Sequence, residues 1–154
     1  MTSARRIGFI VNADETGAEQ AVMNIKQVCD SNRIEYKGIY LDFRKNPPED
    51  PRYLSTTGLV TVNRNNVNWY GLPDEDTVSA FTKLPFDILM DLTVSRRMFT
   101  ADYILRKATA SFRIGISSRP TGIYDMTVSG RDEENGIDTL TVSIFNYLTS
   151  IHTV

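Results

Sequence analysis

The chain has 154 residues, of which 41% are hydrophobic and 23% are charged, and its formal net charge is −2. This length and composition predict one globular domain, residues 1–154, with a single sizeable core. The slightly acidic balance argues against the basic, phosphate-neutralising surface of a nucleic-acid-binding protein.

Residue types that supply catalytic or metal chemistry are scarce. Cys29 is the single cysteine and His152 the single histidine. One cysteine excludes an intrachain disulfide framework and a cysteine zinc cluster. A Ser/His/Asp or Cys/His arrangement would depend on a histidine close to the end of the chain. We therefore expect no metal site, no cofactor and no catalytic residue.

The first residues, MTSARRIGFIVNADE, combine two arginines with an apolar run of only GFIV. A signal peptide needs an apolar core of roughly 7 to 15 residues. No window of the chain approaches the roughly 20 apolar residues of a membrane span. The sequence predicts a cytoplasmic protein that does not contact a membrane.

The first third of the chain predicts a strand, a helix and a second strand. Residues 6–11, RIGFIV, form a short apolar run typical of a buried strand. Apolar residues recur every three or four positions over 17–31, which indicates an amphipathic helix. Residues 34–43 predict a strand with a bulge at Gly38. The proline-rich stretch 44–52, RKNPPEDPR, predicts a surface loop.

Residues 59–70, LVTVNRNNVNWY, predict a β-hairpin around an RNN turn, because asparagine tolerates left-handed backbone. The pair Trp69 and Tyr70 forms either a partner-binding or sugar-stacking surface or, as an alternative, the cap of a core. Pro73 and the acidic residues 74–76 predict the start of another helix.

The second half of the chain predicts further strand and helix alternation. Residues 86–92, FDILMDL, indicate a strand, and a helix is expected to begin with Thr100 as its cap. A strand over 112–116, an edge strand over 123–129 and a final helix with its apolar stripe over 137–151 follow.

Alternating strands and helices predict right-handed βαβ crossovers and a sheet covered on both faces. The expected fold is α/β, a three-layer Rossmann-like domain with a mostly parallel sheet, one β-hairpin and an edge strand. Such sheets bind ligands beyond the carboxyl ends of their strands. The relevant loops are therefore 12–16, 93–99 and 117–122.

The loop after the first strand is NADETG, which lacks the glycine spacing of a dinucleotide fold and the Gly-Lys-Ser/Thr ending of a phosphate loop. Asp14, Glu15 and Glu19 place negative charge where a phosphate would bind, so an anionic cofactor is disfavoured. These carboxylates either complement the helix dipole or contribute to a magnesium site.

A ligand site is predicted at the carboxyl edge of the sheet. Asp91 ends a strand, the loop after it holds Ser95, Arg96 and Arg97, and Arg119 follows the next strand. Arginine forks bind carboxylate or phosphate, so this group would hold a small anionic ligand. The alternative is a rim of solvated arginines in which one pairs with a carboxylate.

The run FDILMDLTVSRRMFTADYILRKATASFRIGI, taken with VNWYGLPDED upstream and the final helix, resembles an uncharacterised family of small bacterial α/β proteins, a domain of unknown function. The resemblance covers nearly the whole chain. It implies a fold and a free-standing domain, and it implies no activity.

The same run is also similar to the N-terminal half of heptosyltransferase-type glycosyltransferases. The matching order is a strand ending in Asp over 87–92, an alanine-rich helix over 101–110 and the Arg-Ile-Gly strand at 113–115. Those enzymes carry a second Rossmann-like half, for which 154 residues leave no room, and a glycine-rich acceptor loop, which NADETG replaces here. The resemblance therefore implies at most a half domain that binds a ligand.

Two functional hypotheses follow. The first is a non-catalytic domain that acts through a protein partner or self-association, with Trp69 and Tyr70 on the interacting surface. The alternative is the binding of a small anionic ligand, such as a sugar phosphate, by Asp91 and the residues around it.

Overall fold

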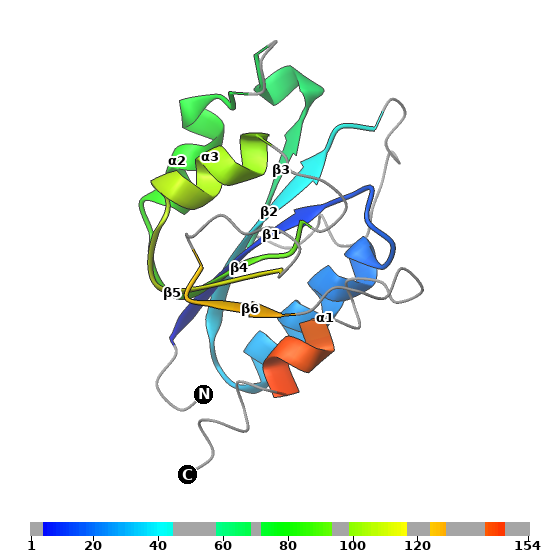
Figure 1. The fold of residues 1–154 in the computed structure, drawn as a ribbon, viewed down its shortest axis with the longest axis vertical. Helices are drawn as coiled ribbons and strands as arrows, with labels where there is room; N and C mark the ends of the chain where they lie inside the picture. Colours follow the sequence, from blue (N-terminus) through cyan, green and yellow to red (C-terminus); the bar gives the residue numbers. More distant parts are fainter. Residues whose placement is uncertain are drawn as a thin grey trace.

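The computed structural model describes residues 5–44, 58–68, 72–93, 99–116, 124–128 and 141–146. A six-stranded parallel sheet in the order β3-β2-β1-β4-β5-β6 forms the centre of the molecule (Figure 1). Its elements along the chain are β1 (Arg6–Asn12), α1 (Ala18–Ser31), β2 (Glu35–Asp42), β3 (Leu59–Asn63), η2 (Arg64–Asn66), α2 (Glu75–Thr82), β4 (Pro85–Asp91), α3 (Phe99–Lys107), β5 (Thr109–Ile116) and β6 (Met126–Val128).

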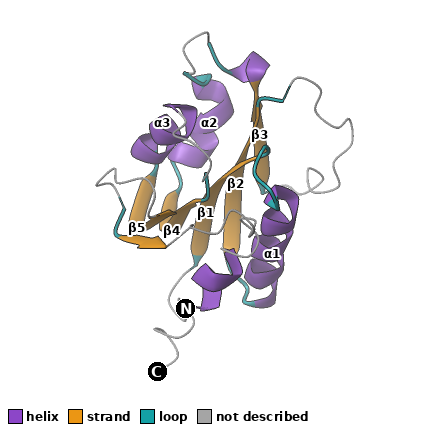
Figure 2. Cartoon of the chain, turned by 45° about the vertical axis from the view of Figure 1, so that its right-hand side comes forward, coloured by secondary structure: helices purple, strands orange, loops and turns teal. Residues whose placement is uncertain are grey.

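Helices cover both faces of the sheet, so the fold has three layers (Figures 1 and 2). On one face α1 packs beside a further helical stretch, 141–146, whose Ile144 and Phe145 join the same buried cluster as the apolar side of α1. On the other face α2 and α3 bury a second cluster against the sheet. The predicted Rossmann-like α/β class is therefore confirmed.

The predicted amphipathic helix is α1. Its apolar residues fall on one stripe and are buried against β1 and β2: Ala18, Ala21, Val22, Ile25 and Cys29. Burial raises the pKa of the Cys29 thiol to about 12, with the neighbouring Asp30 carboxylate contributing less. This cysteine is a protonated core residue.

The chain passes through Gly38 without the expected bulge. Gly38 lies opposite Phe9 in a continuous parallel register between β1 and β2. The Phe9 ring occupies the space where a Cβ at this position would lie. The glycine is therefore required by close packing rather than by an irregular backbone.

The hairpin expected over 59–70 is wrong in its first part. β3 pairs in parallel with β2, and the RNN segment forms the 3₁₀ helix η2. The Asn63 side chain accepts a hydrogen bond from the Asn65 backbone N–H at 2.9 Å, and Asn66 Oδ1 accepts one from the Asn63 N–H at 3.0 Å. These side chains satisfy the turn locally, which favours a helical turn over a hairpin. Trp69 and Tyr70 lie outside the described residues.

The second half of the sheet follows the sequence prediction closely. β4 forms as predicted, β5 begins three residues earlier than expected, and β6 is the predicted edge strand, pairing in parallel with β5. Thr100 is a buried residue of the first turn of α3, which starts at Phe99, rather than the cap before it. None of the helices within the described ranges has the length and apolar character to cross a bilayer.

Candidate functional site at the carboxyl edge of the sheet

The strand order reverses direction beside β1, which defines the switch point of the sheet. From β1 the chain continues through α1 to β2, whereas β4 continues through α3 to β5 on the opposite side. The residues that directly follow β4 and β1 are hydrogen-bonded to the neighbouring strands. The Leu92 N–H donates to the Ile10 carbonyl at 2.9 Å, and the Ala13 N–H donates to the Leu41 carbonyl at 2.8 Å. In open α/β sheets ligands bind at this crevice.

Asp91 lies at this edge, as predicted, with 1% of its surface exposed. Its Oδ1 accepts hydrogen bonds from the Thr93 backbone N–H at 3.1 Å and from the Thr93 hydroxyl at 2.6 Å. Its Oδ2 accepts one from the Tyr124 hydroxyl at 2.5 Å. The carboxylate therefore fixes the direction in which the chain leaves β4 and ties β4 to the segment before β6.

The other predicted site residues, Ser95, Arg96, Arg97 and Arg119, lie outside the described residues. The structure does show where β4 and β5 end, and the predicted site residues follow these ends in the chain. The chain leaves β4 at Asp91 and β5 at Ile116, and these parallel strands end at the same edge of the sheet.

Asp87 lies near the amino end of β4, whereas Arg113 lies in the middle of β5 and its side chain is directed back along the strand. The Arg113 Nη2 donates to the Ala108 carbonyl at 2.7 Å, back toward the start of β5. Asp87 Oδ2 accepts the backbone N–H groups of Arg5 and Arg6 at 2.8 and 2.9 Å. These hydrogen bonds hold the pKa of Asp87 below its ordinary value of 3.8. Asp87 thus fastens the start of β1 to β4, far along the strand from Asp91.

A cavity of about 400 Å³ opens at the same carboxyl edge, between the start of α1 and the end of β2. It is lined by Ala13, Glu15, Gly17, Ala18, Glu19, Gln20, Met23, Tyr40 and Arg44. Sequence reasoning directed attention to loops after β1, β4 and β5 and missed Tyr40 and Arg44. The available signal was the Asp-Phe-Arg tripeptide at the carboxyl end of β2, which brings polar side chains to this edge.

Arg44 is fixed by Asp42 at the mouth of this cavity. The Arg44 Nε donates to Asp42 Oδ1 and its Nη2 to Asp42 Oδ2, both at 2.8 Å, which is the bidentate geometry of a strong ion pair. The side-chain hydrogen bonds from Arg44 lower the pKa of Asp42 below its ordinary 3.8 despite burial.

The loop between β1 and α1 wraps around Asn12. Asn12 Oδ1 accepts the Asp14 N–H at 3.1 Å, and the Asn12 carbonyl accepts the Glu15 N–H at 3.0 Å. Gly17 precedes α1 with a φ of 81°, a left-handed conformation that favours glycine. Glu19 lies in the first turn of α1, where its charge complements the helix dipole.

This strand order, with helices on both faces of the parallel sheet (Figure 1), defines a Rossmann-like α/β domain. A family model described as a family of unknown function (DUF6913) matches residues 1–151. The chain therefore belongs to this family.

Among solved structures, the chain is similar to E. coli heptosyltransferase WaaC, solved with ADP. The TM-score is 0.60 at 10% sequence identity, and the match covers 92% of this chain and 46% of that chain. This chain thus spans about half the length of the enzyme structure, and the likeness is one of fold. No match was found among curated proteins.

Proposed function

We propose that this protein binds a small anionic ligand at the carboxyl edge of its sheet, beside the switch point between β1 and β4. Ser95, Arg96, Arg97 and Arg119 supply the contacts. The observation that carries this proposal is the strand order, because the connection with Ser95, Arg96 and Arg97 leaves the sheet at the position where open α/β sheets bind ligands.

The buried contacts of Asp91 support this location. Its carboxylate holds Thr93 through two hydrogen bonds and receives a third from Tyr124. A fixed start of the β4 connection lowers the conformational entropy that ligand binding has to overcome. In this proposal Asp91 is a positioning residue, and the function is binding without catalysis.

The ligand class follows from the arginines. Guanidinium groups bind phosphate and carboxylate oxygens through paired hydrogen bonds, so a sugar phosphate, a nucleotide or a dicarboxylate suits them. ADP belongs in the test because the structurally similar heptosyltransferase was solved with it.

The alternative, docking of a protein partner or self-association, requires a large exposed apolar patch. In the part of the chain that the structure describes, two large apolar side chains are exposed, Met23 at 53% and Val142 at 46%. Trp69 and Tyr70, on which this alternative depends, lie outside the described residues. The proposal of ligand binding is based on the strand order.

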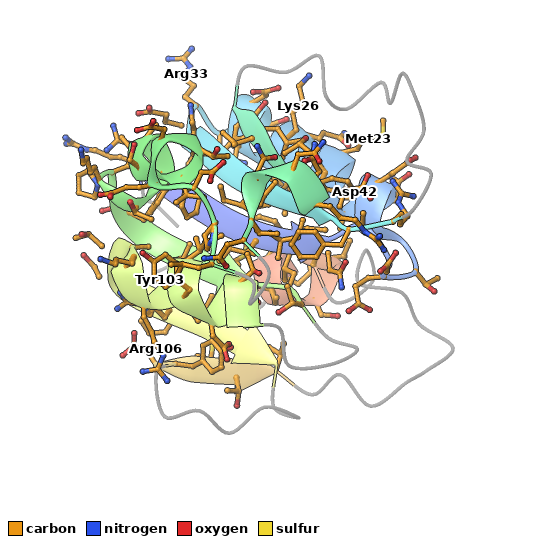
Figure 3. The ribbon with its side chains drawn as sticks, turned by 90° about the horizontal axis from the view of Figure 1, so that it is seen from above. Met23, Lys26, Arg33, Asp42, Tyr103 and Arg106 are labelled. Atoms are coloured by element: carbon orange, nitrogen blue, oxygen red, sulfur yellow. The ribbon has the colours of Figure 1, made fainter. Side chains whose placement is uncertain are left out.

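The test is thermal unfolding of the wild type and of the double variant Arg96→Ala/Arg97→Ala with phosphate, glucose 6-phosphate, ADP and succinate. A ligand at 100 times its Kd adds about 2.7 kcal/mol to the stability of the state that binds it. The matched control is Arg106→Ala/Lys107→Ala, which removes an adjacent exposed cationic pair from the last turn of α3. Figure 3 shows Arg106 on α3, across the molecule from Met23 and Asp42.

The proposal predicts that at least one anion stabilises the wild type and the control but not the Arg96/Arg97 variant. Equal stabilisation of all three proteins would show that the anion binds elsewhere and not at Arg96 and Arg97. Absence of stabilisation by every anion would overturn the proposal and leave the partner hypothesis.

A further inference from the structure

The amino edge of the sheet, where its strands begin, carries a row of exposed cations. The basic row consists of the exposed basic residues that directly precede four of the strands: Arg33, Arg5, Lys83, Arg106 and Lys107. We propose that the basic row binds an extended acidic segment of a partner protein, whose carboxylates contact these guanidinium and ammonium groups. The inference does not depend on the arginines after β4.

The strand order places these cations, which are far apart in the chain, in a line. Arg33 precedes β2, Arg5 precedes β1, Lys83 precedes β4, and Arg106 and Lys107 precede β5. These four strands are consecutive neighbours in the sheet. Neighbouring strands lie about 4.8 Å apart, so the four strand starts span roughly 14 Å. Figure 3 shows the two ends of the basic row, Arg33 and Arg106, on one side of the molecule.

The cations of the basic row are not neutralised within the described part of the fold. None of the five side chains forms an ion pair with a described residue. Two carboxylates at this edge have other partners. Glu35 pairs with the Arg6 guanidinium at 2.9 Å, and Asp87 accepts the backbone N–H groups of Arg5 and Arg6. The row therefore offers charge to a partner.

The amino edge is positive although the chain as a whole has a net charge of −2. Seven basic and four acidic residues, a formal net charge of +3, lie in the described stretches that lead into the six strands: 5–8, 28–37, 58–61, 79–87, 104–111 and 124–128. The undescribed stretches that precede β1, β3 and β6 hold three basic and two acidic residues, and all undescribed residues together hold six of each. The undescribed residues therefore add no net negative charge.

The backbone of Arg33 supplies a second, independent observation. Its φ is 56°, the one positive φ of a non-glycine residue in the described ranges. The Ile34 N–H donates to the Cys29 carbonyl at 2.8 Å, which closes α1 in the motif that usually contains glycine at the left-handed position. Arginine is strained there. A cation in the last turn of α1 would complement the helix dipole without this strain, so a contact outside the described fold accounts better for arginine at this position.

The dimensions and chemistry of the basic row favour an acidic peptide. An extended peptide rises about 3.3 Å per residue, so four or five residues match a row of roughly 14 Å. Aspartate and glutamate carboxylates bind arginine through paired hydrogen bonds. Proteins that bind single-stranded nucleic acid combine cations with aromatic rings on which the bases stack. Among the aromatic side chains whose burial the structure describes, none is exposed.

The experiment measures the fluorescence anisotropy of labelled hexaglutamate, titrated with the full chain at low ionic strength. Hexaglutamine is the neutral comparator. Hexathymidylate and phosphatidylglycerol vesicles represent the other polyanions, nucleic acid and lipid. The first test variant is Arg106→Ala/Lys107→Ala, and its matched control is Arg96→Ala/Arg97→Ala, an adjacent pair of equal charge beyond the carboxyl end of β4. The second test variant is Arg33→Gly, and its control is Lys26→Ala, an exposed cation on α1.

We expect saturable binding of hexaglutamate by the wild type and both controls, weakening as salt is added. The Arg106/Lys107 variant should bind it at least tenfold more weakly, and hexaglutamine should not bind. Arg33→Gly should weaken binding by about threefold. The same substitution should raise the melting temperature, because glycine adopts the left-handed conformation without strain. A merely structural role of Arg33 would not combine higher stability with weaker binding.

Three results would overturn the inference: equal binding by the Arg106/Lys107 variant, loss of binding in the Arg96/Arg97 variant, or tighter binding of hexathymidylate or of the vesicles than of hexaglutamate. The two double variants also separate this inference from the proposed function. The Arg106/Lys107 variant should lose hexaglutamate and retain the small anion, whereas the Arg96/Arg97 variant should do the reverse. Failure of either proposal thus leaves the other one standing.

Discussion

Phe9 and Gly38 show how single residues set the spacing inside this sheet. They lie opposite one another on β1 and β2, and the Phe9 ring covers the glycine. Phe9 is fully buried, so its ring has no room to retreat. A phenylalanine ring also covers Gly8 of β1, where Phe86 of β4 reaches across from a position three residues before Leu89, the register partner of Gly8. Close ring-to-backbone packing thus links the three central strands.

Gly38→Ala should destabilise the protein by about 1–3 kcal/mol, because the added methyl group overpacks the core against the Phe9 ring. Urea unfolding measures the change. The variant Phe9→Leu in the Gly38→Ala background should recover part of the loss, although Phe9→Leu alone is destabilising. Purely additive effects of the two substitutions would contradict the proposed contact.

At this scale the sequence predicted Asp91 at the carboxyl edge of the sheet, because a polar residue that ends an apolar strand is a local signal. It did not predict the partners of Asp91. Tyr124 lies 33 positions further along the chain, and only the pairing of β5 and β6 brings its hydroxyl to the carboxylate. The role of Arg44 was missed for a related reason, since the cavity exists only where α1 packs against β2.

Among the elements, β6 is short, and the segment that leads into it is held to the sheet by single side chains as well as by strand pairing. It is a three-residue edge strand. The Tyr124 ring crosses Gly115 of β5, where a Cβ would lie 2.5 Å from the ring, and its hydroxyl reaches Asp91 on β4. The Asp125 carboxylate accepts the Arg113 N–H at 2.7 Å, which adds a second connection.

Tyr124→Phe should cost about 1–3 kcal/mol, because it removes a hydrogen bond to a buried carboxylate while the ring remains over Gly115. Hydrogen exchange should accelerate at the amides of β6 and leave those of β1 unchanged. Tyr103→Phe on α3 is the matched control, since its ring keeps the contact with the Lys107 ammonium at 5.7 Å. Uniform acceleration throughout the sheet would show that Tyr124 has no local role.

The elements were predicted well where one periodicity dominated. The apolar stripe of α1 and the apolar run of β4 both formed as expected. The hairpin over 59–70 failed because the asparagines cap a 3₁₀ turn and because β2 offers β3 an edge with which to pair. The first cause is local, whereas the second depends on the whole sheet.

At the scale of the whole molecule, two carboxylates among the described residues have lowered pKa values and make folding sensitive to acid. Asp87 accepts backbone hydrogen bonds at the amino edge, and Asp42 accepts the Arg44 guanidinium at the carboxyl edge. A carboxyl whose pKa is lower in the folded state stabilises that state above its unfolded pKa. This stabilisation is lost as the pH falls through the folded value. The free energy of unfolding is therefore expected to decrease below about pH 4, as both carboxylates become protonated.

Asp87→Asn should lower the unfolding free energy at pH 7, and the difference from the wild type should narrow as the pH falls below the ordinary value of 3.8. Urea unfolding at a series of pH values measures this. Asp30→Asn, at an exposed position on α1, is the control for the loss of one negative charge. If the difference in unfolding free energy between the wild type and Asp87→Asn stayed constant down to about pH 2.5, the charge of Asp87 would contribute nothing to stability.

By itself the sequence determined the class of fold, the nature of most elements and the strand ends at which polar residues gather, because these depend on periodicity and on neighbours in the chain. Only the tertiary structure decided the strand order, the parallel pairing of β3, the hydrogen bond from Tyr124 to Asp91 and the cavity beside α1. Each of these joins residues far apart in sequence. Their proximity is a property of the packed sheet, which local propensity does not encode.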